Sequence, residues 1–329
     1  MSATRYLEIA ERLSAELAEC ACIADGAPVR VLVGPDVGCV TAQVREPVLE
    51  QRFLLGDVLA CRAEVELAAT AAGPCASGRP RGRAGRRGAR RRGAVRPRAE
   101  KVQTGADGTP TMRLDILVDT AIAEVVNAHR INLLSEELGS IDNGSAITLV
   151  TDPVDGTANA ASGVPLSAFA GVIAVDGVPT EALTSWLDTG RCWHTVAGQP
   201  SPYRTNGRTE LDGAAVSLLR PQPQIADAWW RVATRAARIR ILSTSCLEAV
   251  LVTEKSTDAF ADAGSDTHRI VDLAAAMVTV PAAGGAVIDV RGRPLEIDPD
   301  LTRRWSGVVA ATPRLAEELP ETIRGTEDR

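Results

Sequence analysis

Two aspartates, Asp152 and Asp155, lie three residues apart in the stretch TLVTDPVDGTANAASGVP, residues 148–165. They follow an apolar run typical of a buried strand, and Pro153 between them denies the chain a further ladder hydrogen bond. We therefore predict that the strand ends at Asp152 and that the chain turns there. Both carboxylates and the Val154 carbonyl can then converge on one point. Hard oxygen donors of this kind are the ligands that Mg²⁺ prefers.

The next two residues indicate an anion site beside these carboxylates. Gly156 permits close backbone approach or an unusual dihedral angle. Thr157 is suited to cap a following helical turn, where free N–H groups attract an anion. The stretch therefore predicts a magnesium–phosphate site.

One motif supplies too few ligands, and other acids lie in suitable places. Glu136 and Glu137 stand in a loop after a predicted helix, Asp272 begins a helix in an apolar setting, and Asp115 lies near threonines. Each has a structural alternative, because an aspartate can serve a turn or cap a helix and glutamates can be surface residues. The functional interpretation rests on the whole set.

Composition limits the class of protein. The 329 residues are 45% hydrophobic, which is enough for a sizeable core in one large domain or two. The net charge is −6, yet residues 73–99 hold ten arginines and no acid, which leaves the rest of the chain at −16. An acidic protein of this kind disfavours nucleic acid as the main partner. Three explanations of residues 73–99 stay open: a disordered linker, a basic arm for anionic partners, and coding sequence read out of frame.

The cysteines and the hydropathy of the chain indicate the cellular compartment in which the protein works. The seven cysteines form no C-x-x-C pair, which favours a reducing cytoplasm over a disulfide framework or a zinc site. The start of the chain has no signal pattern. The longest uncharged run, residues 273–288, is broken by Pro281, Gly284 and Gly285, so we predict no membrane span.

Mixed helix and strand patterns predict layered α/β or α+β packing. Helices are predicted over residues 4–23, 115–130 and the start of 271–289; strands are predicted from residues 29, 39 and 53 and over 147–150, 166–176 and 181–197.

Three motifs resemble the inositol monophosphatase family of magnesium-dependent sugar and inositol phosphatases. D-P-V-D-G-T-A-N at 152–159 resembles its first signature, and V-D-L-A-A-A with A-A-G-G at 282–285 resembles its second. Glu136-Glu137 matches the acidic pair upstream of the first signature. The resemblance covers about residues 100–318.

The resemblance implies an αβαβα sandwich, two or three Mg²⁺ ions, a small phosphorylated polyol or sugar as substrate, and often a homodimer. The implied metal ligands are Glu136, Asp152, the Val154 carbonyl, Asp155 and Asp272. Gly156 and Thr157 would bind phosphate together with Asp155, and Asp115 and Thr157 would orient the attacking water. Val271 and Ala160 depart from the family pattern, and residues 263–269 have no clear match, so substrate identity does not follow.

The first residues resemble another family. FLLGDVLACRAEVELA, residues 53–68, is similar to a pattern of the G subunit of the bacterial carbon–phosphorus lyase complex, and the likeness covers about residues 3–72. It implies an assembly component that could bind other subunits of that complex. An unrelated α+β cap is the alternative.

We therefore predict a lyase-like segment at 1–72, an Arg/Gly-rich linker at 73–99 and a phosphatase domain at 100–329. The predicted function is magnesium-dependent hydrolysis of a sugar or inositol phosphate by metal-activated water, linked to phosphonate metabolism. The alternative is a non-catalytic assembly component of the phosphonate-degrading system.

Overall fold

The computed structural model describes residues 29–31, 40–42 and 101–325. The first two described segments form a pair of short antiparallel strands, β1 (Val29–Val31) and β2 (Val40–Ala42). The predicted helix at 4–23, the strand at 53 and the arginine-rich linker lie outside the described residues. The predicted division of the chain at residues 72 and 99 stays a prediction.

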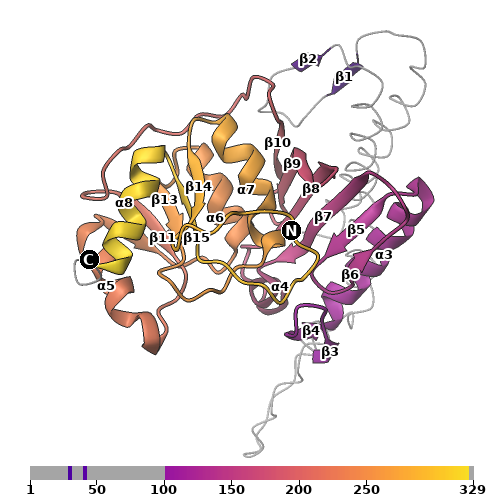
Figure 1. Cartoon of the computed structure of the whole chain (residues 1–329), viewed down its shortest axis with the longest axis horizontal. Coiled ribbons are helices and arrows are strands. Elements are labelled where there is room, and N and C mark those ends of the chain that lie inside the picture. The colour runs from indigo at the N-terminus through magenta and orange to yellow at the C-terminus, as the bar shows by residue number, and fades with distance from the viewer. Residues whose placement is uncertain (1–28, 32–39, 43–100, 326–329) are drawn as a thin grey trace, which may run out of the picture.

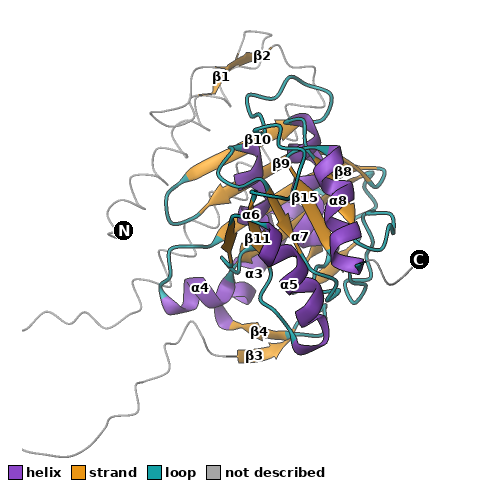
Figure 2. Ribbon diagram, turned by 90° about the vertical axis from the view of Figure 1, so that its left-hand side faces the viewer, coloured by secondary structure: helices purple, strands orange, loops and turns teal. Residues whose placement is uncertain are grey.

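Residues 101–325 fold into five alternating layers, which confirms the layered α/β architecture (Figure 1). A six-stranded sheet has the order β10-β9-β8-β7-β5-β6, and a five-stranded sheet has the order β12-β11-β13-β15-β14. Helices α6 and α7 lie between the two sheets, α3 covers the outer face of the first, and α5 and α8 cover the outer face of the second (Figures 1 and 2).

The strands of the first sheet are β5 (Asn132–Ser135), β6 (Gly139–Ile141), β7 (Ile147–Asp155), β8 (Ala168–Val175), β9 (Val178–Trp186) and β10 (Arg191–Val196). Those of the second are β11 (Ala215–Leu218), β12 (Arg238–Arg240), β13 (Ala259–Ala261), β14 (Ala286–Asp289) and β15 (Gly307–Ala310). A small hairpin of β3 (Lys101–Thr104) and β4 (Pro110–Met112) precedes the first helix. The helices are α3 (Arg113–His129), α4 (Thr157–Ser162), η2 (Pro223–Ile225), α5 (Ala226–Arg235), α6 (Ser245–Thr253), α7 (Ile270–Ala282) and α8 (Pro313–Arg324).

The layering explains the apolar runs of the central elements. β7 and β8 are buried along most of their length, because helices cover both faces of their sheet. α7 is buried almost all round, as a helix between two sheets must be. Within the described part of the chain, no helix combines the length and the apolar character that crossing a membrane requires.

Two sequence predictions need correction. β7 does not end at Asp152 but continues to Asp155, because its pairing with β8 shifts between these residues and a bulge accommodates Pro153 where no ladder hydrogen bond is needed. The run 181–197 is not one strand: it contains the end of β9 and all of β10, separated by a turn at Gly190.

Candidate metal centre

The site is built around the end of β7. The bulge lets Asp152 and Asp155 both point to one side, although strand alternation alone would set residues three apart on opposite faces. Asp152 is almost wholly buried, and its Oδ1 accepts a hydrogen bond from the Val154 N–H at 3.1 Å.

Gly156 makes the turn from β7 into α4 possible. Its φ is +80°, and a Cβ atom there would lie 2.8 Å from the Leu166 carbonyl oxygen and 3.2 Å from Thr244 Cβ. Only glycine meets both demands. The predicted cap is wrong: Gly156 itself precedes α4 and Thr157 is the first helical residue, with its hydroxyl donating to the Val154 carbonyl at 2.9 Å.

The predicted carboxylates meet in two groups that share Asp152. Glu136, Asp152 and Asp272 form one group, and Asp152, Asp155 and Cys246 form the other, with potential ligand atoms within 4.8 Å of one another in each. The structure thus brings together four predicted metal ligands that are spread over residues 136–272. The buried thiol of Cys246 was not predicted, because in the sequence it is one apolar position among several on α6.

Asp155 also anchors the start of α6. Its Oδ2 accepts bonds from the Thr244 hydroxyl and from the N–H groups of Cys246 and Leu247, and its Oδ1 accepts the Ser245 N–H at 2.9 Å. A carboxylate that faces the N–H groups of a helix start is stabilised by the helix dipole.

Glu136 and Glu137 turn to different partners. Glu136 faces the carboxylate cluster, whereas Glu137 accepts a hydrogen bond from the Thr111 hydroxyl. Their turn between β5 and β6 is held by the fully buried Asp119, which accepts bonds from Ser135 Oγ and from the Glu137 N–H at 3.2 Å. Asp119 was not predicted, although a lone acid on the apolar face of a helix was a signal for it.

Burial raises the pKa of most of these acids. It raises the pKa of Glu136 to about 7, an effect that Arg269 opposes and that the Asp272 charge increases. Burial and the charges of Glu136 and Asp155 raise the pKa of Asp152 well above its usual range. For Asp272 the cost of burial is outweighed by the Arg269 guanidinium, which lowers its pKa. A divalent cation is the natural counter-charge for such a cluster, so the donor set fits a hard metal ion.

Asp115 and Thr157 are neighbours, as the resemblance implied. Burial, then the charge of Glu136, raises the pKa of Asp115 to about 7, while hydrogen bonds from the Met112 N–H and the Thr157 hydroxyl lower it. The Asp115 Oδ1 is buried and has no hydrogen-bond partner in the described structure. An unpaired acceptor of this kind beside a carboxylate cluster is available to a water molecule.

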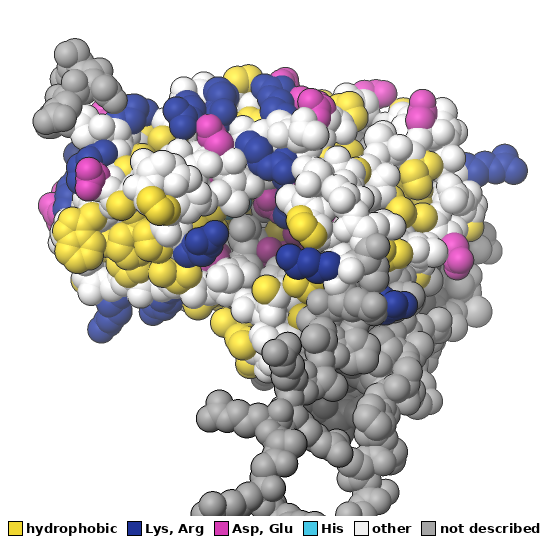
Figure 3. Space-filling model, turned by 90° about the horizontal axis from the view of Figure 1, so that it is seen from below, with side chains coloured by type: hydrophobic (Ala, Val, Ile, Leu, Met, Phe, Trp, Pro, Cys, Tyr) yellow, Lys and Arg dark blue, Asp and Glu magenta, His cyan; other side chains and the backbone are white. Residues whose placement is uncertain are grey.

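Asn159 and Glu248, which were not predicted, position the loop at residues 242–244 against the site. Asn159 Nδ2 donates to the carbonyls of Leu166 at 2.9 Å and Leu242 at 2.8 Å. The buried Glu248 accepts the N–H groups of Leu242 and Thr244. The acidic cluster lies toward the face that carries α4. In Figure 3, acidic side chains are visible in a hollow near the centre of this face, with Lys and Arg side chains around it.

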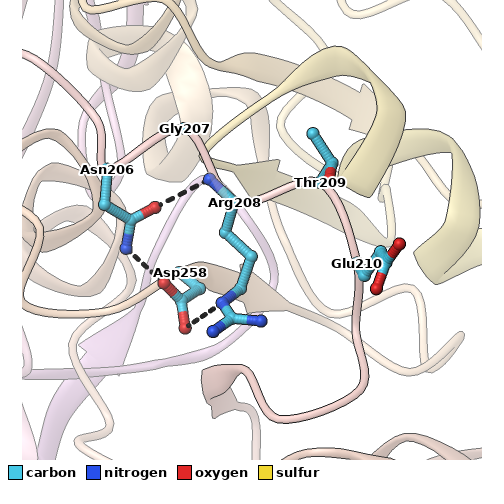
Figure 4. Close-up of a pocket in the computed structure, with 6 residues that line it drawn as sticks. All are labelled: Asn206, Gly207, Arg208, Thr209, Glu210 and Asp258. Carbon is cyan, nitrogen blue, oxygen red and sulfur yellow. Dashed lines mark hydrogen bonds and ion pairs between the residues drawn. The ribbon is translucent and has the colours of Figure 1, made fainter.

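A second hollow, of about 370 Å³, lies at Asn206, Gly207, Arg208, Thr209, Glu210 and Asp258 (Figure 4). Two of its charges pair with each other: Arg208 Nε lies 3.3 Å from Asp258 Oδ2, and Asn206 donates to the same carboxylate. This hollow positions a loop and offers no comparable ligand set.

The sequence and the solved structures agree on a family. The sequence model of the inositol monophosphatase family matches residues 84–327. The chain therefore belongs to the inositol monophosphatase family, which confirms the resemblance of the phosphatase motifs. The match begins inside the arginine-rich segment. Nothing in it concerns the first 72 residues, whose likeness to the lyase subunit stays a prediction.

Several characterised relatives are similar over most of their length. A fructose-1,6-bisphosphatase/inositol-1-monophosphatase from Methanothermobacter thermautotrophicus is 30% identical over 247 residues, covering 68% of this chain and 87% of the relative. An inositol-1-monophosphatase from Mycolicibacterium smegmatis is 30% identical over 230 residues, covering 65% and 79%. A solved Pyrococcus horikoshii protein with similarities to inositol-1 monophosphatase is 26% identical, covers 70% of this chain and 90% of its own, and superposes with a TM-score of 0.59.

Proposed function

We propose that this protein hydrolyses the phosphate monoester of a sugar or inositol with Mg²⁺ as cofactor. The observation that carries the proposal is the convergence of Glu136, Asp152, Asp155 and Asp272 into two ligand groups that share Asp152. The names of the relatives support the substrate class, since they act on inositol monophosphate and fructose 1,6-bisphosphate.

The chain's own residues supply the ligands and hold the substrate. Glu136, Asp152 and Asp272 would hold one cation and Asp155 would share a second with Asp152, and the remaining lone pair of the Val154 carbonyl is a further donor. When bound, the ions supply an acidified water and offset the charge on the leaving oxygen. The backbone N–H groups of Gly156 and Thr157 would orient the phosphate, because the first N–H groups of a helix have no partner within it.

Asp115 and Thr157 would orient the attacking water. The Thr157 hydroxyl has one hydrogen, which can go either to the Val154 carbonyl or to the Asp115 carboxylate, so it serves one of these two acceptors at a time. With a pKa of about 7, Asp115 can hold or release a proton near neutral pH. Its unpartnered Oδ1 is then the acceptor for a hydrogen of the water.

Three further points belong to this proposal. The enzyme would work in the cytoplasm, it would form a homodimer as family members often do, and its substrate would arise in phosphonate breakdown. The last point, and any binding to lyase subunits, rests on the likeness of residues 3–72 alone.

The test is a substrate panel with purified protein and MgCl₂. We expect turnover of inositol and sugar monophosphates, and a loss of roughly 10²-fold or more in kcat/KM for Asp152→Asn, which removes the charge shared by both ligand groups. Glu210→Gln, at the second hollow, is the matched control. Equal background rates for wild type and Asp152→Asn would refute the proposal. The panel compares ribose phosphates with inositol phosphates, because the likeness to the lyase subunit suggests a sugar phosphate as substrate. If ribose phosphates are not preferred, the link to phosphonate metabolism loses its support and the proposed hydrolysis is unaffected.

A further inference from the structure

A guanidinium lies inside the proposed metal centre. Arg269, the residue before α7, has a side chain only 16% exposed, and it contacts three carboxylates at once. Its Nη2 lies 2.8 Å from Asp272 Oδ1 and its Nε lies 3.1 Å from Asp272 Oδ2. Its Nη1 donates to Glu136 Oε1 and lies 3.0 Å from Asp107 Oδ2.

Two of these three partners belong to one ligand group. Glu136 and Asp272 are members of the group with Asp152, and Arg269 donates to both side-chain oxygens of Asp272 and to one of Glu136. A guanidinium stays charged at any pH at which the protein is folded, and it binds carboxylates through a fixed fork. Arg269 and a bound cation would therefore compete for the same carboxylate oxygens.

The third partner, Asp107, can keep its contact with the guanidinium when Glu136 binds a cation. The Asp107 side chain is fully buried and lies outside both ligand groups. Its carboxylate accepts bonds from the N–H and the hydroxyl of Thr109, both at 2.8 Å, and lies 3.5 Å from Arg304 Nη2. Asp107 is thus held in place by contacts that a cation at Glu136 would not disturb.

We propose that Arg269 is a positioning residue that sets the cation affinity of the Glu136–Asp152–Asp272 group. It supplies the positive charge that keeps these buried carboxylates together, and it gives up Glu136 to an incoming divalent cation while Asp107 retains the guanidinium. The affinity of this group is therefore weaker than its three carboxylates alone would give. This inference rests on the proposed function and assigns a role in it to one residue of this chain.

The experiment compares metal-free wild type with Arg269→Gln by calorimetric titration with MgCl₂. We expect one cation to bind roughly tenfold more tightly in the variant. This is the size of change expected when the cation no longer has to displace one charge-assisted hydrogen bond. Arg293→Gln is the matched control, because Arg293 pairs with two carboxylates, Asp266 and Asp289, that belong to neither group. Its Mg²⁺ affinity should equal that of wild type.

Thermal unfolding gives a second readout that a merely structural role would not produce. Without metal, Arg269→Gln should unfold at a lower temperature than wild type, because its clustered carboxylates lack their counter-charge. With saturating MgCl₂ the difference should close. Arg269→Lys keeps the charge without the fork, so it should fold and bind Mg²⁺ with intermediate affinity even if Arg269→Gln does not fold.

The outcomes separate this inference from the proposed function. Unchanged or weaker Mg²⁺ binding in Arg269→Gln, or in Arg269→Lys if the first variant does not fold, would overturn the inference while wild type still hydrolysed phosphate esters. Failure of wild type and variants alike to bind Mg²⁺ would overturn both. Binding in Arg269→Gln but not in wild type would support the inference and contradict magnesium-dependent catalysis by the natural chain.

Discussion

At the residue scale, acids in the same pocket have different environments and therefore different tasks. Asp272 keeps a lowered pKa because Arg269 outweighs its burial, whereas burial raises the pKa of Asp115 to about 7. Asp115 titrates near neutrality, which suits proton transfer, whereas Glu136 and Asp152, whose pKa values burial also raises, lie in the ligand groups, where a bound cation would favour their ionised forms. Asp115 belongs to neither ligand group, so its role can be tested without removing a proposed metal ligand.

We predict that Asp115→Asn lowers kcat by roughly 10²- to 10⁴-fold, the usual contribution of a general acid or base, with little change in Mg²⁺ affinity. Thr157→Val, which keeps the shape of the side chain without its hydroxyl, should also lower kcat. If the two residues orient one water, the double variant should lose no more activity than the worse single variant. Steady-state kinetics and calorimetric titration check this. If the loss in kcat of the double variant equals the product of the two single losses, the two residues act independently and do not share one role.

At the element scale, the turn between β7 and α4 joins the metal ligands to the start of α6. Gly156 approaches the Leu166 carbonyl and Thr244, while Asp155 accepts the first N–H groups of α6. The turn, α4 and α6 must therefore shift together if the backbone at residue 156 moves. Any such shift would displace two proposed metal ligands, Asp152 and Asp155. Calorimetric titration would detect the displacement as a change in Mg²⁺ affinity.

We predict that Gly156→Ala lowers the free energy of unfolding by about 1–3 kcal/mol, because a strained left-handed backbone conformation and a close backbone contact are combined at one residue. Activity with MgCl₂ should fall as well. Gly177→Ala is the control: Gly177 has a φ of +77° but nothing within 4 Å of the added Cβ, so it should lose less stability and keep its activity. Denaturant unfolding measures both. Equal losses would show that the conformation alone, and not the contact, matters.

At the scale of the whole molecule, the sequence predicted what depends on local pattern. The sequence alone predicts the buried strands, helix α7 and the acids beside them, because apolar periodicity and motif spacing are local properties. The contact of Arg269 with Asp107, 162 residues apart, and the contact of Asn159 with Leu242, 83 residues apart, could not be predicted from the sequence. They depend on which elements the sheets bring together. Pro153 misled the strand prediction because a bulge can accommodate proline where a regular ladder cannot.

The buried acids also make stability depend on pH. Burial raises the pKa of Asp115, Glu136 and Glu137 to about 7 in the folded protein, against about 4 in an unfolded chain. Between about pH 4 and 7 the folded state holds protons that the unfolded state has released, so stability falls as pH rises through this window. Acids with a lowered pKa, such as Asp272 and Asp289, lose their contribution only below about pH 4 and do not oppose this trend.

We therefore predict that the melting temperature of the protein in EDTA falls from pH 5.5 to pH 8. Mg²⁺ requires ionised ligands, so the rise in melting temperature on adding MgCl₂ should be larger at pH 8 than at pH 5.5. Scanning calorimetry at both pH values, with EDTA and with MgCl₂, measures the four temperatures. Glu136→Gln, which removes one of the acids whose pKa burial raises, should flatten the fall in EDTA. A melting temperature in EDTA that rises from pH 5.5 to pH 8 would show that these carboxylates are not the groups whose burial governs the stability of the metal-free fold.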